Sequence, residues 1–317
     1  MEHSPEILTD PWRHALAALR AHGRAVLVMV VDHSGSVPGV TGARLVVSED
    51  GIAGTIGGGT AEMELVERAR NHSGDAAIVR FRHTPNEGGT LCSGLQIFAI
   101  ILLSQNDIQE LQTLVGTLDA DQTGTIELSP EGLRFHPGQA EPHVFSQDET
   151  SWSYRGPIGL EDTLYIIGGG HVSLALSRVM ATLPFRIVVL DDRQELPTMA
   201  ANSFAHEMRV VELDRVGEFV EEGEHSWAVI MTFGHKHDRM ALEGLLGKKL
   251  AYLGLMGSAA KVQRLFKDLE AEGTPREDLD GVRAPVGLSI GSHTPEEIAI
   301  SIAAEIIALR NRNEGPG

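Results

Sequence analysis

The sequence predicts an α/β protein of two domains: an N-terminal α+β domain over residues 1–158 and a C-terminal domain over residues 159–317, built on a doubly wound parallel sheet. Its 317 residues exceed the roughly 100–200 residues that are typical of one domain. Strand and helix patterns alternate only in the second half, which indicates a parallel sheet with helical crossovers. Between Asp119 and Gly159, glycine, proline and polar residues break the pattern into short hairpin-like pieces, and we expect the boundary there.

The first predicted element is a helix whose two ends are marked by residue type. Asp10 can cap its start, Pro11 suits its first turn, and Gly23 can end it. A tight turn at Glu49-Asp50-Gly51 joins two short apolar runs, so we expect a hairpin there. Together, the apolar runs of this half predict a helix from about Thr60 to Asn71 and strands at Ala25–Val31, Arg44–Ser48, Ile52–Ile56, Ala76–Phe81 and Leu95–Leu103.

The second half repeats a strand followed by a helix. The segments between its strands carry apolar residues at helical spacing, so we expect right-handed crossovers. Thr294 and Glu297 form a capping box around Pro295, which marks the start of a last helix. This order of elements predicts a Rossmann-like domain. Its strands are expected at Leu164–Ile167, Arg186–Leu190, Met208–Glu212, Trp227–Thr232 and Leu250–Leu255.

Charge and apolar runs exclude several classes of partner. The formal net charge of −18, without a Lys/Arg cluster, disfavours binding to nucleic acid or to anionic lipid. The longest apolar run, Leu95–Leu103, is far shorter than the roughly 20 residues that span a bilayer. The segment Met1–Pro5 lacks the pattern of an export signal, and a single cysteine fits a reducing compartment. We therefore expect a cytoplasmic protein that binds neither nucleic acid nor membrane.

The strongest local motif is Gly168-Gly169-Gly170-His171, which directly follows a predicted strand and opens a predicted helix. Glycines in such a turn let the backbone approach a phosphate, and the helix N-terminus supplies unpaired N–H donors. Asp191 ends the next strand, about 20 residues on, where such folds place an acid for ribose hydroxyls. We expect a nucleotide or another phosphate-bearing cofactor here. The alternative is a turn that packs tightly and binds nothing.

A second glycine turn, Gly57-Gly58-Gly59, precedes the predicted helix that contains Glu62. Its N–H groups could face an anion, whereas Glu62 could serve only the helix dipole.

Cys92 lies in a polar loop, Leu91-Cys92-Ser93-Gly94. It is either a small buried side chain or a thiolate with a depressed pKa near a metal or sulfur centre.

Polar residues also follow the predicted strand Trp227–Thr232. His235, His237 and Asp238 lie at the sheet edge where open α/β folds bind ligands. His-x-His spacing can ligate zinc or iron, but the sequence provides no assured third ligand, so no metal site is assigned. Alternatively, Asp238 caps the next helix and the histidines are exposed loop residues.

The motifs taken in order carry a resemblance that no one of them carries alone. In the first half they are Gly35-Ser36-x-Pro38, Gly42-Ala43, Gly54–Gly59 with Glu62, and the Cys92 loop. In the second half they are Gly170-His171-Val172, Thr232 with His235 and Asp238, Tyr252-x-Gly254–Ser258 with Lys261, and Ala284–Gly291 leading into Thr294–Ala299. Over most of its length the chain resembles the xanthine dehydrogenase accessory protein family of the XdhC/CoxI type. Departures from the family pattern are Ser93, Ser173, Phe233, Gly234 and Ser289.

The resemblance implies an accessory factor that binds molybdenum cofactor, either molybdopterin or its dinucleotide form. Such a factor delivers the cofactor, after sulfuration, to an apo molybdenum hydroxylase of the xanthine dehydrogenase type. The resemblance also implies a cysteine desulfurase as a partner, a homodimer, and a chaperone-like role more than turnover. The cofactor-binding residues it implies are Gly57, Gly58, Gly59, Glu62, Cys92, Gly168, Gly169, Gly170, His171, Asp191, Thr232, His235, Asp238, Gly257 and Ser258.

Two other functions remain open at this point. An oxidoreductase using NAD(P) or another nucleotide is compatible with the second half, although the first half offers no assignable acid/base pair. A structural or interaction protein with vestigial glycine turns is the other alternative.

Overall fold

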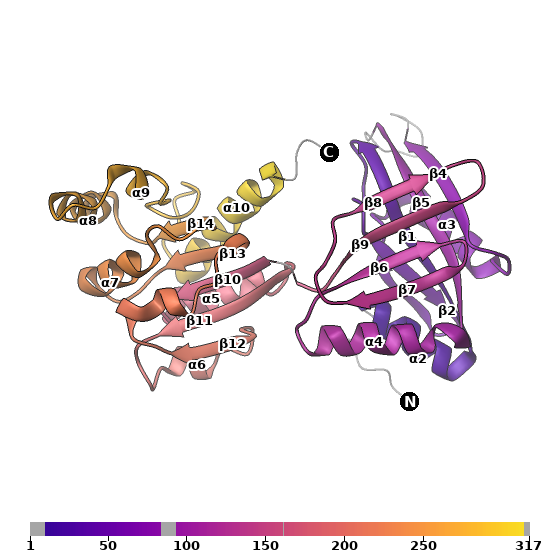
Figure 1. Cartoon of the computed structure of the whole chain (residues 1–317), viewed down its shortest axis with the longest axis horizontal. Helices are drawn as coiled ribbons and strands as arrows, with labels where there is room; N and C mark the ends of the chain where they lie inside the picture. Colours follow the sequence, from indigo (N-terminus) through magenta and orange to yellow (C-terminus); the bar gives the residue numbers. More distant parts are fainter. Residues whose placement is uncertain (1–9, 84–92, 161, 314–317) are drawn as a thin grey trace. The chain divides into compact units, whose positions relative to one another are not determined.

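The computed structural model describes residues 10–83, 93–160 and 162–313 (Figure 1). The chain divides into two compact units, one up to Gly159 and one from Leu160 onward. Each unit has its own sheets and its own hydrophobic core. Among the described helices, none is both long and apolar enough to cross a bilayer.

The N-terminal unit contains two antiparallel sheets, with strand orders β3-β2-β1-β5-β4 and β7-β6-β9-β8. The predicted hairpin is present as the pair β2 and β3. Its elements are α2 (Pro11–His22), β1 (Arg24–Gly35), β2 (Arg44–Ser48), β3 (Gly51–Thr55), α3 (Gly59–Asn71), β4 (Ala77–His83), β5 (Gly94–Ser104), the 3-10 turn η1 (Gln105–Asp107), α4 (Ile108–Asp119), β6 (Gly124–Ser129), β7 (Gly132–Pro137), β8 (Val144–Gln147) and β9 (Trp152–Ile158).

Strand β1 lies at the centre of the first sheet and is buried on both faces. Leu27 and Met29 pack into a core that also holds side chains of α2, α4 and the second sheet. Val26 and Val28 point to the opposite face, where α3 covers the sheet. Successive residues of a strand alternate between faces, so burial on both sides explains its continuous apolar run.

The C-terminal unit contains one five-stranded parallel sheet, of order β12-β11-β10-β13-β14. The prediction of a Rossmann-like C-terminal domain is confirmed. Its elements are β10 (Asp162–Ile167), α5 (His171–Met180), β11 (Phe185–Asp191), α6 (Pro197–Ala200), β12 (Glu207–Val210), the 3-10 turn η2 (Leu213–Glu218), β13 (Gly223–Ile230), α7 (His235–Leu245), β14 (Leu250–Leu255), α8 (Ala259–Ala271), α9 (Arg276–Asp280) and α10 (Pro295–Asn313).

Helices cover both faces of this sheet. One core contains residues of α5 and α10, and the other contains residues of η2, α7 and α8. The predicted capping box is formed, because the Glu297 amide donates to Thr294 Oγ1 at 3.2 Å and the Thr294 amide donates to Glu297 Oε2 at 3.1 Å. The chain proceeds from β10 to one side through β11 and β12, then to the other through β13 and β14. The carboxyl ends of β10 and β13 therefore form the switch point at which open α/β sheets bind ligands.

Candidate functional site

The glycine turn after β10, which comprises Gly168, Gly169 and Gly170, begins with a position that tolerates only glycine. Gly168 has a φ of +111°, and a β-carbon there would lie 2.5 Å from the carbonyl oxygen of Met231. Gly170 differs, because its φ is −75° and a β-carbon would meet no atom of the described residues within 4 Å. Gly168 thus serves close packing of the turn against the end of β13, whereas the space beside Gly170 is open.

The acid that ends β11 is buried and fully engaged. Asp191 is 1% exposed and accepts four hydrogen bonds: from the Gly169 amide at 2.6 Å, from the Arg193 amide at 2.9 Å, and from Arg193 Nε and Nη2 at 2.8 and 2.7 Å. Burial raises the pKa of Asp191, but the hydrogen bonds from Arg193 and Gly169 outweigh it and hold the pKa below its ordinary value. The carboxylate is therefore ionised at neutral pH, and both of its oxygens are occupied within the chain.

Helix α6 lies against the middle glycine of the turn. Thr198 Oγ1 donates to the carbonyl oxygen of Gly169 at 2.5 Å. A β-carbon on Gly169 would lie 2.6 Å from Cγ of Met199 and 3.2 Å from Cδ1 of Leu196. The space between the glycine turn and the end of β11 is therefore filled by side chains.

Three polar side chains connect the ends of β13 and β14. Thr232 Oγ1 donates to Asp238 Oδ1 at 2.5 Å, and Lys261 Nζ in α8 donates to Asp238 Oδ2. Asp238 is 1% exposed and lies in the first turn of α7, whose N-cap is Gly234, so Asp238 does not cap the helix. Ser258 caps α8, and its Oγ accepts from the Lys261 amide at 3.3 Å. Of the residues named from the sequence, Thr232, Asp238 and Ser258 are thus connected through Lys261, and Gly257 directly precedes Ser258.

The two histidines after β13 turn toward different carboxylates. His235 Nε2 lies 3.7 Å from Asp268 Oδ2, and His237 Nε2 lies 3.7 Å from Asp192 Oδ2. Within residues 10–83, 93–160 and 162–313, no three His, Cys, Asp or Glu side chains are placed to hold one metal ion. His171 is exposed at the first position of α5.

Phe233 is the side chain at this edge that most needs an explanation. It follows Thr232, whose Cα would lie 3.0 Å from a β-carbon on Gly168, and it is 80% exposed. An exposed aromatic ring at the carboxyl edge of an open α/β sheet, where such sheets bind ligands, is a candidate contact for a flat apolar surface.

In the N-terminal unit, the turn Gly57–Gly59 already holds an anion of its own chain. Glu62 Oε2 accepts from Thr55 Oγ1 at 2.6 Å, from the Ile56 amide at 2.9 Å and from the Gly58 amide at 3.1 Å. Burial raises the pKa of Glu62, but these hydrogen bonds outweigh it, so the pKa lies below its ordinary value. Glu62 thus closes the turn, which is more than an interaction with the helix dipole.

The other N-terminal motifs meet beside this turn. A β-carbon on Gly57 would lie 2.5 Å from the Gly39 nitrogen, and one on Gly39 would lie 2.1 Å from the Ile56 oxygen. The buried Gln96 side chain donates to the Gly39 carbonyl at 2.6 Å, and the Ser36 amide donates to the Ser93 carbonyl at 3.2 Å. Cys92 lies outside the described residues.

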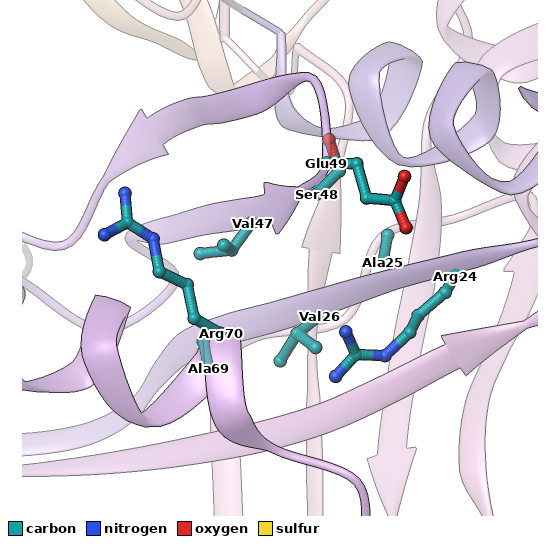
Figure 2. Close-up of a pocket in the computed structure, with 8 residues that line it drawn as sticks. All are labelled: Arg24, Ala25, Val26, Val47, Ser48, Glu49, Ala69 and Arg70. Carbon is teal, nitrogen blue, oxygen red and sulfur yellow. The ribbon is translucent and has the colours of Figure 1, made fainter. Parts of the chain in front are cut away.

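A separate hollow of about 280 Å³ lies at the far end of α3 from this turn (Figure 2). Val26 and Val47 form part of its floor, and the guanidinium groups of Arg24 and Arg70 extend over it from opposite sides. Arg24 donates to the carbonyl of His72, and Arg70 Nη1 lies 4.0 Å from Glu67. None of the cofactor-binding residues predicted from the sequence lines this hollow.

Sequence reasoning missed Arg193 and the side chains of α6. Arg193 stands two residues after Asp191, and this spacing is the local signal that the acid could be paired within the chain. No local signal identifies Met199, because its contact with Gly169 depends on how the chain returns after β11.

Comparison with known proteins gives two family matches. The model described as the XdhC Rossmann domain matches residues 164–306, and that of the XdhC and CoxI family matches residues 18–82. A solved structure, a xanthine dehydrogenase from Bacillus halodurans, has a TM-score of 0.73 and 23% identity over 96% of each chain, which shows a shared fold.

Several curated proteins are also similar. The molybdenum cofactor insertion chaperone PaoD of Escherichia coli is 24% identical over 98% of this chain and 93% of that protein. A probable xanthine dehydrogenase subunit of Bacillus subtilis is 30% identical over 54% of this chain and 49% of its own length. The protein YqeB of Escherichia coli is 27% identical over 91% of this chain and 44% of its own length. This chain therefore spans about half the length of the last two.

Proposed function

This chain belongs to the XdhC and CoxI family, and on that premise we propose that it is an accessory factor that binds molybdenum cofactor for a molybdenum hydroxylase of the xanthine dehydrogenase type. Its similarity to the insertion chaperone PaoD extends over nearly the whole of both chains, which supports a chaperone-like role. The cofactor is the cargo in this proposal, and the chain need not turn over a substrate.

The observation that carries the proposal is the open position at Gly170. The N-terminus of α5 faces the switch point, and the space in which a β-carbon of Gly170 would stand contains no atom of the described residues. Backbone N–H groups at a helix start bind phosphate, and molybdopterin carries a phosphate.

The residues proposed to contact or shape the cofactor site fall in two sets. In the C-terminal unit they are Gly168, Gly169, Gly170, His171, Asp191, Thr232, His235, Asp238, Gly257 and Ser258. In the N-terminal unit they are Gly57, Gly58, Gly59, Glu62 and Cys92. Their roles differ: Asp191 and Glu62 hold the two glycine turns in shape, whereas Gly170 and His171 face open space.

The finer steps of the function are also proposals. We propose that the factor protects the cofactor during sulfuration by a cysteine desulfurase and then delivers it to the apo hydroxylase. We propose further that it works in the cytoplasm as a homodimer. An NAD(P)-dependent reaction is disfavoured by the geometry of Asp191, since both carboxylate oxygens that would accept from a ribose are already bonded.

The experiment that tests this function is purification of the full chain from a host grown with molybdate, followed by oxidation of any bound pterin to its fluorescent derivative. We expect the amount of bound pterin to rise in proportion to the amount of wild-type protein. The Gly170→Val variant should carry little pterin. Equal, background-level fluorescence from both proteins would contradict the proposal. Activation of an apo hydroxylase by the loaded wild-type protein, measured as restored hydroxylase activity, would extend the result to delivery.

A further inference from the structure

We propose that Arg44, His33 and His143 form a binding site in the N-terminal unit for an oxyanion, a phosphate or carboxylate group of a small molecule. The three side chains come from the start of β2, from β1 and from the residue that precedes β8. None of them belongs to the residues proposed to contact the cofactor, and the site does not depend on that cargo. It is carried by an arginine without a carboxylate partner and by two imidazoles whose unbonded nitrogens are donors.

Arg44 differs from other partly buried arginines in its lack of an acidic partner. Arg239 Nε lies 3.0 Å from Glu243, and Arg310 Nε lies 2.6 Å from Asp162. Arg44 is half-buried as well, yet it forms no ion pair with a carboxylate of the described residues. Burial lowers the pKa of its guanidinium, because a charge removed from water is costly unless it is paired. An anion beside Arg44 would therefore stabilise it.

Uncharged contacts hold the guanidinium of Arg44 in place. Its Cζ lies 4.9 Å from the centroid of the Trp12 ring, and its Nη1 donates to the Gly42 carbonyl at 3.2 Å. The charge of Asp10 reaches Arg44, but the Asp10 oxygens already accept from the Trp12 amide and from Arg13 Nε. Nε and Nη2 of Arg44 bond no acceptor in the described ranges, and neither is fully buried, so a ligand can reach them. Guanidinium N–H groups match the oxygens of carboxylate and phosphate.

The hydrogen bonds of His33 determine which of its ring nitrogens is a donor. The Thr41 amide donates to His33 Nδ1 at 3.2 Å, and Thr41 Oγ1 lies 2.7 Å from the same nitrogen. A backbone amide can only donate, so Nδ1 is an acceptor, and the proton of the neutral ring is on Nε2. Nε2 has no partner in the part of the chain that the structure describes, and it is not fully buried. His33 therefore offers one accessible N–H donor.

His143 offers a donor for a similar reason. Its Nδ1 lies 2.7 Å from the hydroxyl of Tyr154, which is 1% exposed and has no other acceptor among the described residues. The hydroxyl therefore donates to Nδ1, and the proton of the neutral ring is on Nε2. Burial, together with the nearby Arg44 and His33, lowers the pKa of His143, so this neutral form is present at neutral pH.

The adjacent residues Thr41 and Gly42 contact all three side chains. Gly42 accepts from Arg44, and a β-carbon on Gly42 would lie 2.7 Å from Cε1 of His143 and 3.3 Å from its Nε2. Thr41 bonds His33. A metal ion would need a lone pair on the imidazoles, but these lone pairs are on the two Nδ1 atoms, which are already bonded. Donors without an acceptor suit an anion.

Calorimetry with inorganic phosphate and with acetate tests the site, with sodium chloride at the same ionic strength as the reference. The measurements use full-length protein that carries Gly170→Val, so that phosphate binding at the start of α5 does not contribute. We expect at least one oxyanion to bind, and Arg44→Met to weaken it at least tenfold. Arg20→Met is the matched control, since it removes the same charge from an exposed position on α2 of the same unit. Binding of phosphate alone would identify a phosphate ligand, and binding of acetate alone a carboxylate.

A second measurement keeps the test valid if circular dichroism shows that Arg44→Met does not fold. The bound oxyanion should stabilise protonated His143 and raise its pKa, followed by NMR as the pH-dependent shift of its imidazole resonance. His143→Phe identifies that resonance, and it should weaken the oxyanion at least threefold because it keeps a ring but removes the donor. The inference is overturned if neither oxyanion binds more tightly than chloride, if Arg44→Met weakens binding no more than Arg20→Met, or if the pKa of His143 does not rise. None of these results bears on whether the wild-type protein carries a pterin, so the two proposals fail separately.

Discussion

Lys261, in the first turn of α8, donates to the buried carboxylate of Asp238, in the first turn of α7, and so connects the helices that follow β13 and β14. The other oxygen of Asp238 accepts from Thr232, so one carboxylate holds three segments at the carboxyl edge of the sheet. Removal of one partner would leave an uncompensated charge in the protein interior.

We predict that Lys261→Met lowers the free energy of unfolding by about 2 kcal/mol, less than for a fully buried pair because Lys261 is partly exposed. Urea denaturation measures the change. Lys267→Met is the matched control, since Lys267 lies on the exposed side of the same helix. If Lys261→Met lowers the free energy of unfolding no more than Lys267→Met does, the bond from Thr232 alone stabilises Asp238.

The glycine turn after β10 gives a pair of substitutions with opposite expectations. Gly170→Val places its side chain in open space but at the N-cap of α5, so the circular dichroism should stay near wild type and the stability should fall by no more than about 1 kcal/mol, while phosphate-ligand binding is lost. Gly168→Ala should lower the stability by about 2 kcal/mol, because its φ is +111° and its β-carbon would press on the Met231 carbonyl. If Gly170→Val still binds the phosphate ligand, the glycine turn serves only the packing of the domain.

The lowered pKa of Glu62 predicts a dependence of stability on pH. A carboxyl group whose folded pKa lies below its unfolded value of about 4.3 stabilises the fold above that value, and the effect is lost as the pH falls through the folded pKa. Glu62→Gln should therefore be less stable than wild type at neutral pH, by about 1 kcal/mol, and the difference should shrink below about pH 4. Thermal melts of both proteins from pH 7 to pH 3 measure this difference. A difference in melting temperature that stays the same at every pH would contradict the stabilising role of the ionised Glu62.

Cys92 gives a prediction about cofactor handling. A thiolate is well matched to a soft molybdenum centre with sulfur ligands, so we predict that Cys92→Ser folds normally but retains less cofactor and activates an apo hydroxylase more slowly. Gly58→Val should show a similar defect, because Gly58 belongs to the other glycine turn that we propose shapes the cofactor site. Full activation by Cys92→Ser would return Cys92 to the role of a small packed side chain.

The proposed homodimer predicts a solution mass twice that of one chain. Light scattering at micromolar concentration measures it directly, and a monomer mass at that concentration would reject the proposal.

Local signals predicted elements whose ends are set by neighbouring residues. Helix α2 runs from Pro11 to His22, with the side chain of Asp10 bonded to the Trp12 amide and Gly23 in a left-handed conformation, as its capping residues indicate. The β10 to β14 alternation was predictable for the same reason, because each strand and crossover is a continuous apolar segment. The four-stranded sheet was not resolved from the sequence, since β6 pairs with the distant strand β9 and such pairing leaves no local pattern. Helix α4 was missed for another reason, because its helical spacing of Leu111, Leu114 and Val115 was present but not used.

The candidate site was predictable in position but not in its internal connections. The order of strands placed Gly168–Gly170 and Thr232–Asp238 at one edge, and the structure does bring them together. The sequence could not show that Arg193 donates to the carboxylate of Asp191, or that the carboxylate of Glu62 accepts from the turn Gly57–Gly59. In each case the same acidic residue is compatible with a ligand contact and with an internal bond, and only the three-dimensional distances distinguish them.

The contact between Gly39 and Gly57 has a consequence for how this sequence can vary. A side chain on either residue would collide with the backbone of the segment that holds the other, whether or not any ligand is ever bound. A library of random variants screened only for the amount of folded protein should therefore keep glycine at both positions while it accepts many residues at Gly170. Such a screen would separate the glycines that the fold requires from those that can be replaced when only folding is selected.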